Sequence, residues 1–345
     1  MIGVLISLII LLFILGGLLF YLLTRRPIIP QPPPSTLTPT PTSPPTPSPL
    51  PQTLEKTKLP QTDEKTKPPQ TLEKTKPPLD NGDYNSKCYY NAAYEDKDKM
   101  DKIQDVQKNV KGCYILVEPD NINTDIIKNL QAKNNKVGCY ISVGTIEDNR
   151  SDFSKFKKGV DYSDKNMVDW THEFVIKGDN NGNPTANTVN LMKQRIDKLA
   201  DLNCDYIELD NMDADQEDYN KKYKTNLNSN GMKNYTSNLC DYIHNNPKRK
   251  MKCIFKNENS SDYTKFDALQ LELNANEKPS WDTKLIKHFI DNKKPIWVSQ
   301  YGKKSSDECK KSFEDIKQKY GDGFGMVCSV YGNDNKYYHY GGSAP

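Results

Sequence analysis

The sequence lacks the signatures of several common enzyme classes. Its eight cysteines include no C-x-x-C pair and its four histidines are scattered, so we expect no structural zinc site and no iron–sulfur cluster. There is no G-x-S-x-G elbow, H-E-x-x-H pair or Walker loop to indicate acyl transfer, metalloproteolysis or phosphoryl transfer. We therefore expect a function that needs neither a metal nor a cofactor.

The sequence also lacks an excess of positive charge. The chain has 48 Lys and Arg side chains and 45 Asp and Glu side chains, of which the first 80 residues hold 8 and 5. The remaining part is therefore neutral, with 40 basic and 40 acidic side chains. Because nucleic-acid-binding domains are normally strongly basic, we expect no nucleic-acid partner.

A long run without charge opens the chain. Residues 2–23 are 22 uncharged positions, enough at about 1.5 Å per residue to cross the hydrocarbon core of a bilayer. The run lacks a basic start and ends in Arg25 and Arg26 instead of a small-residue cleavage site. These features favour an uncleaved transmembrane anchor and not a cleaved signal peptide. We place the anchor at residues 1–24, with the lipid bilayer as its partner.

Prolines are concentrated in the next segment. Of the 23 prolines, 17 lie between residues 27 and 80, where a nine-residue unit is repeated three times, at 51–59, 60–68 and 69–77. Such a sequence cannot bury apolar area, so we expect residues 25–80 to form a disordered low-complexity linker with partly polyproline II character. Stalks of this composition often hold an ectodomain off a membrane, and a neutral spacer is the alternative.

The sequence leaves two alternatives for the side of the membrane on which the folded part lies. Arg25 and Arg26, directly after the apolar run, place the rest of the chain in the cytosol by the positive-inside rule. The stalk-like linker argues instead for a single-pass protein whose folded part lies on the extracellular, lumenal or virion-surface side, and we prefer that side.

From about residue 86, short apolar runs alternate with helix-like segments. This pattern indicates a parallel sheet covered on both faces. Eight such strands close naturally into a (β/α)8 TIM barrel of the α/β class, which we place at residues 81–345. A doubly wound open sheet is the alternative, although no G-x-G-x-x-G follows the first strand.

The expected elements can be given by residue number. The predicted strands are 88–92, 113–117, 137–143, 205–209, 251–255, 268–273, 295–300 and 325–330. The predicted helices are 100–110, 124–134, 189–202, 232–245, 281–292 and 305–320. Two features fit a complete barrel poorly: the segment 260–266 is short for a helix, and no clear helix follows the last strand.

Acidic residues gather at the ends of the predicted strands, where the catalytic groups of such barrels lie. On the fourth strand, Tyr206, Glu208 and Asp210 share one face, so both carboxylates point into the mouth. Burying carboxylates is costly, so the whole set indicates function, whereas any single member could belong to an ion-pair network with Arg150 or Lys256. Two carboxylates across a cleft suit glycoside hydrolysis. The set comprises Glu118, Asp120, Glu147, Glu208, Asp210 and Glu272.

Six short motifs occur in a fixed order over most of residues 110–302. They are Val-Gly-Cys-Tyr-Ile-Ser-Val-Gly at 137–144 with Glu147, Arg150 and Asp152; Trp170 with Glu173; Met192 with Arg195 and Asp197; Asp205 with Glu208, Asp210, Asn211 and Asp213; Lys256 with Asn257; and the strand from Asp267 to Glu272. Together they resemble glycoside hydrolase family 114, the endo-α-1,4-polygalactosaminidase-like barrels. Each motif alone is weak, and their common order makes the resemblance specific.

The resemblance implies that Asp210 and Glu272 are the catalytic pair. Asp210 would be the nucleophile or charge stabiliser, since Asn211 and Lys256 would favour its ionised form. Glu272 would be the general acid/base, with a pKa raised by apolar neighbours such as Leu271 and Leu273, although the two roles could be exchanged. The implied substrate-binding residues, which contact the sugar directly or support the residues that do, are Glu147, Arg150, Glu208, Asn211, Asp213, Lys256 and Asn257.

The resulting hypothesis is a membrane-tethered, endo-acting glycoside hydrolase whose substrate is an amino-sugar polysaccharide similar to α-1,4-polygalactosamine. Extra carboxylates would also suit a cationic substrate. The alternative is a catalytically inactive carbohydrate-binding or surface-structural protein on the same barrel, because residues 273–276 depart from the family's usual sequence after the second acid. Trp170, Trp281 and Trp297 could stack on sugar rings or belong to the core.

The even number of cysteines allows disulfides if the barrel is lumenal, but the connectivity is open. Five cysteines fall in predicted strands, where a small buried apolar residue is the common explanation. They are Cys88, Cys113, Cys139, Cys253 and Cys328.

Overall fold

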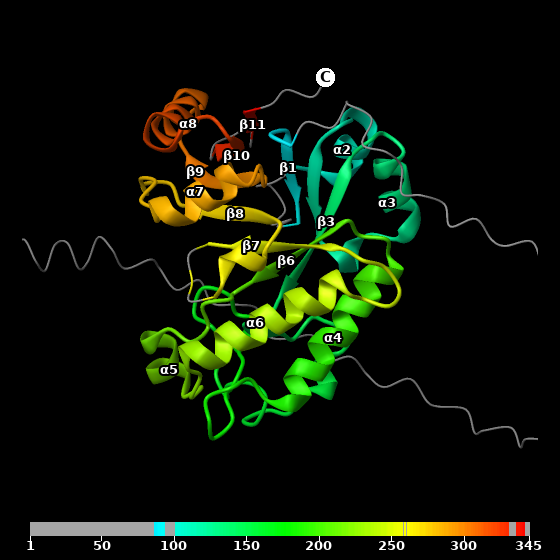
Figure 1. Cartoon of the computed structure of the whole chain (residues 1–345), viewed down its shortest axis with the longest axis vertical. Helices are drawn as coiled ribbons and strands as arrows, with labels where there is room; N and C mark the ends of the chain where they lie inside the picture. The colour runs from blue at the N-terminus through cyan, green and yellow to red at the C-terminus, as the bar shows by residue number, and fades with distance from the viewer. Residues whose placement is uncertain (1–85, 94–100, 258, 260, 331–335, 342–345) are drawn as a thin grey trace, which may run out of the picture. The chain divides into compact units, whose positions relative to one another are not determined.

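The computed structural model describes residues 86–93, 101–257, 259, 261–330 and 336–341 (Figure 1). All of them belong to one compact unit, Lys74–Pro345. The predicted anchor at 1–24 and linker at 25–80 lie outside the described residues, so both remain predictions. Within the described ranges, no helix combines the length and apolar character needed to cross a bilayer.

The centre of the fold is a sheet of parallel strands, and each of the eight predicted strands is present. They are β1 (Tyr89–Ala92), β2 (Tyr114–Val117), β3 (Lys136–Ser142), β6 (Tyr206–Asp210), β7 (Lys252–Lys256), β8 (Ala268–Leu273), β9 (Ile296–Lys303) and β10 (Phe324–Val330). Each pairs in parallel with the next in that order. The strand order never reverses, which excludes the doubly wound alternative.

The sheet is nearly closed into a barrel. An additional strand, β11 (Lys336–Tyr340), pairs antiparallel with β10 at the edge that faces β1. His339 on β11 donates from Nδ1 to the carbonyl oxygen of Tyr89 over 2.8 Å. A Cβ atom on Gly325 would lie 2.4 Å from the carbonyl oxygen of Lys87, so only glycine allows β10 to approach the start of β1 this closely. The fold is therefore TIM-barrel-like.

All six predicted helices are present on the outer face of the sheet (Figure 1). They are α2 (Ile103–Asn109), α3 (Thr124–Gln131), α4 (Ala186–Asp201), α6 (Ser229–His244), α7 (Thr283–Asp291) and α8 (Ser306–Tyr320). The last five start where a side chain accepts a hydrogen bond from a first-turn N–H, which satisfies an otherwise unpaired donor. These capping residues are Asn123, Thr185, Asn228, Asp282 and Ser305.

Two departures from a regular barrel match the weak points in the sequence. After β7 there is a single 3₁₀ turn, Tyr263–Lys265, where 260–266 is short for a helix. After β10 the next element among the described residues is β11, and not a helix. The sequence pattern missed the short helix α5 (Glu217–Tyr223) and the two three-residue strands β4 (Thr145–Glu147) and β5 (Glu173–Val175), which pair antiparallel.

Aromatic side chains fill the lower interior of the barrel. The Trp297 ring stacks on Tyr114 with centroids 3.6 Å apart, and the Tyr206 ring meets it edge-on at 5.7 Å. Trp297 is fully buried, so it belongs to the core and is no sugar platform. Because side chains alternate along a strand, the residues two and four positions after Tyr206 rise from this layer towards the mouth. They are Glu208 and Asp210.

Three disulfides link neighbouring parts of the barrel. Cys88–Cys113 joins the starts of β1 and β2, Cys139–Cys204 joins β3 to the residues before β6, and Cys309–Cys328 joins α8 to β10. Cys240 and Cys253 are buried free thiols. Of the five cysteines expected as small buried residues, Cys253 is therefore a thiol and the other four are in disulfides.

Candidate active site

Lys256 joins the acidic groups at the carboxyl ends of the strands. Its side chain is 2% exposed, and Nζ lies 3.1 Å from Oδ1 of Asp210, 3.1 Å from Oε1 of Glu272 and 3.4 Å from Oε1 of Glu208. Burial lowers the pKa of Lys256, but the three carboxylates hold that pKa well above its ordinary value. The ammonium group therefore stays charged at the centre of the mouth.

Asp210 and Glu272 lie on either side of this ammonium group. Since each contacting oxygen is 3.1 Å from the same nitrogen, the two oxygens are separated by no more than twice that distance, about 6 Å. Their side chains are 16% and 28% exposed, so both reach the opening of the barrel. The structure thus brings together the two residues that the resemblance implies as the catalytic pair.

Two asparagines hold these carboxyl groups. The backbone N–H of Asn211 donates to Oδ1 of Asp210 over 2.8 Å. Nδ2 of Asn257 donates to Oε2 of Glu272 over 3.1 Å, while its Oδ1 accepts from the backbone N–H of Glu272. Both asparagines have positive φ angles, 55° and 53°, a conformation that asparagine adopts more readily than most residues. Two residues predicted to bind substrate are thus direct partners of the carboxyl pair, Asn211 through its backbone and Asn257 through its side chain.

Glu272 also accepts a hydrogen bond from the hydroxyl group of Tyr301 on β9, over 2.9 Å. The two leucines next to Glu272 in the sequence, which were expected to surround it, face away from it. Leu271 and Leu273 are buried in the layer between sheet and helices, because alternation along β8 turns them to the opposite face. The described partners of the Glu272 side chain are polar: Lys256, Asn257 and Tyr301.

Glu208 does not face a substrate. Its side chain is fully buried beneath Lys256, so a direct sugar contact, one of the roles implied by the resemblance, does not fit its position. Its charge instead contributes to raising the pKa of Lys256. The prediction placed the residue on the correct face of the strand but too near the opening.

Two further carboxyl groups lie at the mouth with altered acidity. Burial, followed by the charges of Asp210 and Asp215, raises the pKa of Asp213 to about 6. Burial raises the pKa of Glu173 to about 7, with Asp210 and Glu147 adding to the shift and a hydrogen bond from Thr145 opposing it. In the sequence Glu173 stands out only as part of a motif, because no local pattern there shows that β5 pairs with β4 and lies beside Asn211.

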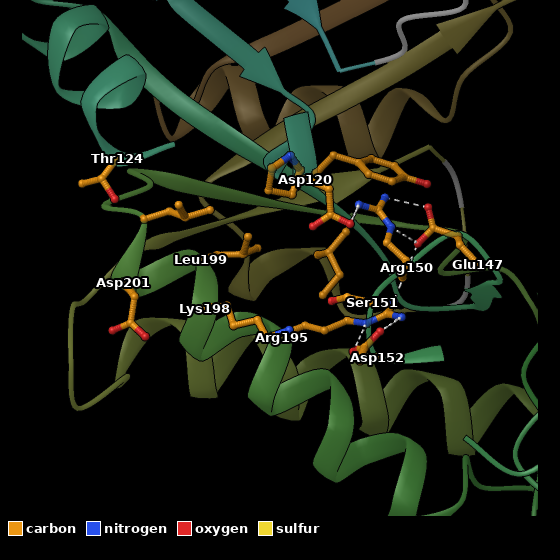
Figure 2. Close-up of a pocket in the computed structure, with 14 residues that line it drawn as sticks. Asp120, Thr124, Glu147, Arg150, Ser151, Asp152, Arg195, Lys198, Leu199 and Asp201 are labelled. Carbon is orange, nitrogen blue, oxygen red and sulfur yellow. Dashed lines mark hydrogen bonds and ion pairs between the residues drawn. The ribbon is translucent and has the colours of Figure 1, made fainter. Parts of the chain in front are cut away.

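Glu147 and Arg150 form an ion-pair network beside the mouth. Arg150 donates to Glu147 and to Glu118, with Nη2 2.7 Å from Oε1 of Glu147 and 3.0 Å from Oε2 of Glu118. Figure 2 shows its guanidinium group between Glu147 and Asp120. Glu118, Asp120 and Glu147 thus belong to an ion-pair network with Arg150, the alternative that the sequence left open for single acidic residues.

This network lines a cavity of about 320 Å³ between the sheet and helices α3 and α4 (Figure 2). Arg195 on α4 lies at its edge and binds Asp152 through two hydrogen bonds of 2.8 Å. Within the described ranges, no group of three His, Cys, Asp or Glu side chains is arranged to hold a metal ion. At the mouth, the carboxyl groups of Glu208, Asp210 and Glu272 surround the ammonium group of Lys256.

Comparison with known proteins gives a family and a fold. The sequence profile of glycoside-hydrolase family GH114 matches residues 104–341. The chain resembles the structure of Aspergillus fumigatus Ega3 in complex with galactosamine, with a TM-score of 0.53 and 18% identity over 75% of this chain and 100% of that one. It also resembles the glycoside hydrolase domain of PelA from Pseudomonas aeruginosa, with a TM-score of 0.48 and 10% identity over 72% of this chain and 96% of that domain. No curated protein sequence matches it significantly.

Proposed function

Because the chain belongs to glycoside-hydrolase family GH114, we propose that it hydrolyses glycosidic bonds within an amino-sugar polysaccharide at the mouth of its barrel. The observation that carries this proposal is the position of Asp210 and Glu272, each 3.1 Å from the ammonium group of Lys256. Two carboxyl groups at this spacing can act on opposite sides of one glycosidic bond.

In this proposal Asp210 attacks the anomeric carbon and Glu272 protonates the leaving oxygen. The Asn211 N–H and the Lys256 ammonium group fix the Asp210 carboxylate. Tyr301 and Asn257 orient the Glu272 carboxyl, which is the more exposed of the two and so the better placed to reach a leaving group. In a second step Glu272 removes a proton from the water that releases the sugar from Asp210.

The separation of the carboxyl groups favours a retaining route. The two oxygens that contact Lys256 are at most about 6 Å apart. Retaining enzymes have separations of about 5 to 5.5 Å, and inverting enzymes begin at about 6.5 Å because a water molecule must fit between the carboxyl groups and the sugar. The upper limit here leaves too little room for that water between these two oxygens.

The charge at the mouth supports an amino-sugar substrate. Glu147, Glu173, Asp210, Asp213 and Glu272 border the opening, whereas Lys256 and Arg150 are already engaged with carboxylates. A surplus of negative charge attracts a polymer whose sugars carry free ammonium groups. Ega3, whose fold this chain shares, is described in a complex with galactosamine.

We further propose that the enzyme is held on a membrane by residues 2–23, with the Pro-rich linker as a spacer. Three disulfides in the barrel support an extracellular, lumenal or virion-surface position, since disulfides persist in oxidising compartments.

The test is to incubate the detergent-solubilised full chain with α-1,4-linked polygalactosamine and with its N-acetylated counterpart. We expect new reducing ends from the free-amine polymer and a rapid fall in its mean chain length, as cleavage within the chain produces. Release of single sugars at constant chain length would contradict the endo-acting mode. Tight binding without any new reducing ends would overturn the hydrolase proposal in favour of a sugar-binding protein.

A further inference from the structure

Glu173 differs from the other carboxyl groups at the mouth in its partners. Lys256 pairs with Asp210 and Glu272, and Arg150 pairs with Glu147, whereas Glu173 forms no ion pair with any described residue. Its contacts are hydrogen bonds from the Thr145 hydroxyl at 2.6 Å and from Nδ2 of Asn211 at 3.3 Å. Both donors use Oε2, and Oε1 takes part in none of the hydrogen bonds described for this residue.

Asn211 links Glu173 directly to the proposed nucleophile. Its backbone N–H donates to Oδ1 of Asp210, and its side-chain amide donates to Oε2 of Glu173. The strand order is β3-β6-β7-β8, so Glu272 on β8 lies on one side of Asp210 on β6. Glu173 belongs to the antiparallel pair β4–β5, which follows β3 on the other side of β6. Glu173 and Glu272 therefore flank Asp210 from opposite directions.

The order Glu272, Asp210, Glu173 matches the order of the leaving oxygen, the anomeric carbon and the neighbouring amino group in an amino sugar. If Asp210 faces the anomeric carbon and Glu272 faces the leaving oxygen, a group on the far side of Asp210 faces the ring substituents next to the anomeric carbon. In a 2-amino sugar the neighbouring carbon carries the ammonium group. We propose that Glu173 binds this ammonium group and is the residue that makes the site prefer a free amine to an N-acetyl group. The inference rests on the proposed function and extends it to specificity.

The electrostatic surroundings of Glu173 support a cationic partner. The ionisable groups that face it are Tyr140 from β3, Glu147 from β4, Asp210 from β6, Lys256 from β7 and Tyr219 from α5. Burial, Asp210 and Glu147 together raise the pKa of Glu173 to about 7, so below that pH a proton neutralises it. An ammonium group in the same place would displace this proton, whereas an uncharged N-acetyl group would not.

Calorimetry measures this displacement without relying on turnover. The full chain would carry Glu272→Gln to prevent cleavage and would be titrated at pH 6.5 with α-1,4-linked galactosamine oligomers, in buffers of different ionisation enthalpy. We expect up to about three-quarters of a proton to be released on binding, the fraction of Glu173 that is protonated at this pH. Adding Glu173→Gln, which keeps the shape, should abolish the proton release and weaken binding by about tenfold, since a charge-assisted bond is lost. Binding of N-acetylated oligomers should change less than about twofold.

A matched control is Glu314→Gln, which removes an exposed carboxylate on the outer helix α8. It should leave both binding and proton release unchanged. The inference is overturned if Glu173→Gln keeps the proton release, or weakens both oligomers equally. Absence of binding of the amine oligomer to the parent protein would overturn it as well.

Failure of this inference can be distinguished from failure of the proposed hydrolysis. If the wild-type chain produces reducing ends but Glu173→Gln keeps the preference for free amines, the function stands and the role of Glu173 falls. If no reducing ends form but binding of the amine oligomer depends on Glu173, the site recognises the amine and the hydrolase proposal falls.

Discussion

At the scale of single residues, Lys256 provides the positive charge that compensates for three carboxylates at the mouth. It is almost completely buried and contacts Asp210, Glu272 and the fully buried Glu208. A buried carboxylate is tolerable only while an opposite charge or hydrogen bonds compensate for its lost hydration. Lys256 therefore stabilises the barrel and orients the proposed catalytic pair at the same time.

Replacing this residue should destabilise the protein. Lys256→Met keeps most of the side-chain volume but leaves Glu208 buried without its ammonium partner. We expect the free energy of unfolding to fall by about 3–5 kcal/mol, the usual effect of breaking a buried pair from one side. Urea unfolding followed by tryptophan fluorescence measures the change, with the exposed Lys311→Met on α8 as the control. An unchanged unfolding midpoint would mean that Glu208 is neutral in the folded protein.

The proposed catalytic pair is tested by amide substitution. Asp210→Asn and Glu272→Gln keep the side-chain shape but remove the attacking charge or the transferable proton. Turnover should fall by at least about 10²-fold in each variant, with the unfolding transition retained. Asp315→Asn, an exposed change on α8, should keep full activity. If both active-site variants remain fully active, the pair is wrong and Glu147 and Glu173 become the carboxyl groups to examine.

At the scale of elements, one ion pair fastens α6 to the sheet. Nε2 of His244, in the last turn of α6, lies 2.7 Å from Oδ2 of Asp267, which precedes β8. The hydrogen bond with Asp267, followed by that with Cys240, raises the pKa of His244 to about 10. Despite the opposing effect of burial, the hydrogen bond from His244 lowers the pKa of Asp267.

This pair predicts a pH dependence of stability. Since the folded-state pKa of His244 is above its unfolded value near 6.5, its contribution is fully present below about pH 6.5 and is lost as the pH rises through about 10. Both side chains are 31% exposed, so solvent screening limits the effect to about 1 kcal/mol. His244→Gln should therefore flatten the unfolding free energy between pH 6.5 and 10 relative to wild type. An identical slope in both proteins would show that the pair contributes nothing.

The regular elements could be predicted from the sequence, and the short ones could not. The eight parallel strands are near-continuous apolar runs because both faces of each are buried, which makes them visible without any tertiary information. By contrast β4 and β5 have three residues each and pair across 25 intervening residues, so neither has a periodicity of its own. The position of Glu173 depends on that pairing, and for this reason it was not among the predicted site residues.

At the scale of the whole molecule, the active site follows from the order of strands around the barrel. Parallel strands joined by outer helices bring all their carboxyl ends to one side, so Asp210, Lys256 and Glu272 meet although 62 residues separate the first from the last. Alternation along a strand predicts which residues face inward. It does not predict their height above the aromatic layer of Tyr114 and Trp297, which is why Glu208 was expected too near the opening.

The membrane anchor is the remaining prediction about the whole molecule. Residues 2–23 form an uncharged and mostly apolar run whose transfer into lipid is favourable whatever the barrel does. We expect the full chain to stay in the membrane fraction after washing with alkaline carbonate, while a chain starting at Asn81 is recovered in the supernatant. Protease treatment of sealed vesicles then gives the side of the barrel. The barrel should be digested in vesicles that turn the extracellular or lumenal face outward, and it should be protected in vesicles that turn this face inward. Release of the full chain by carbonate would contradict the anchor, because peripheral attachment alone is reversed by that treatment.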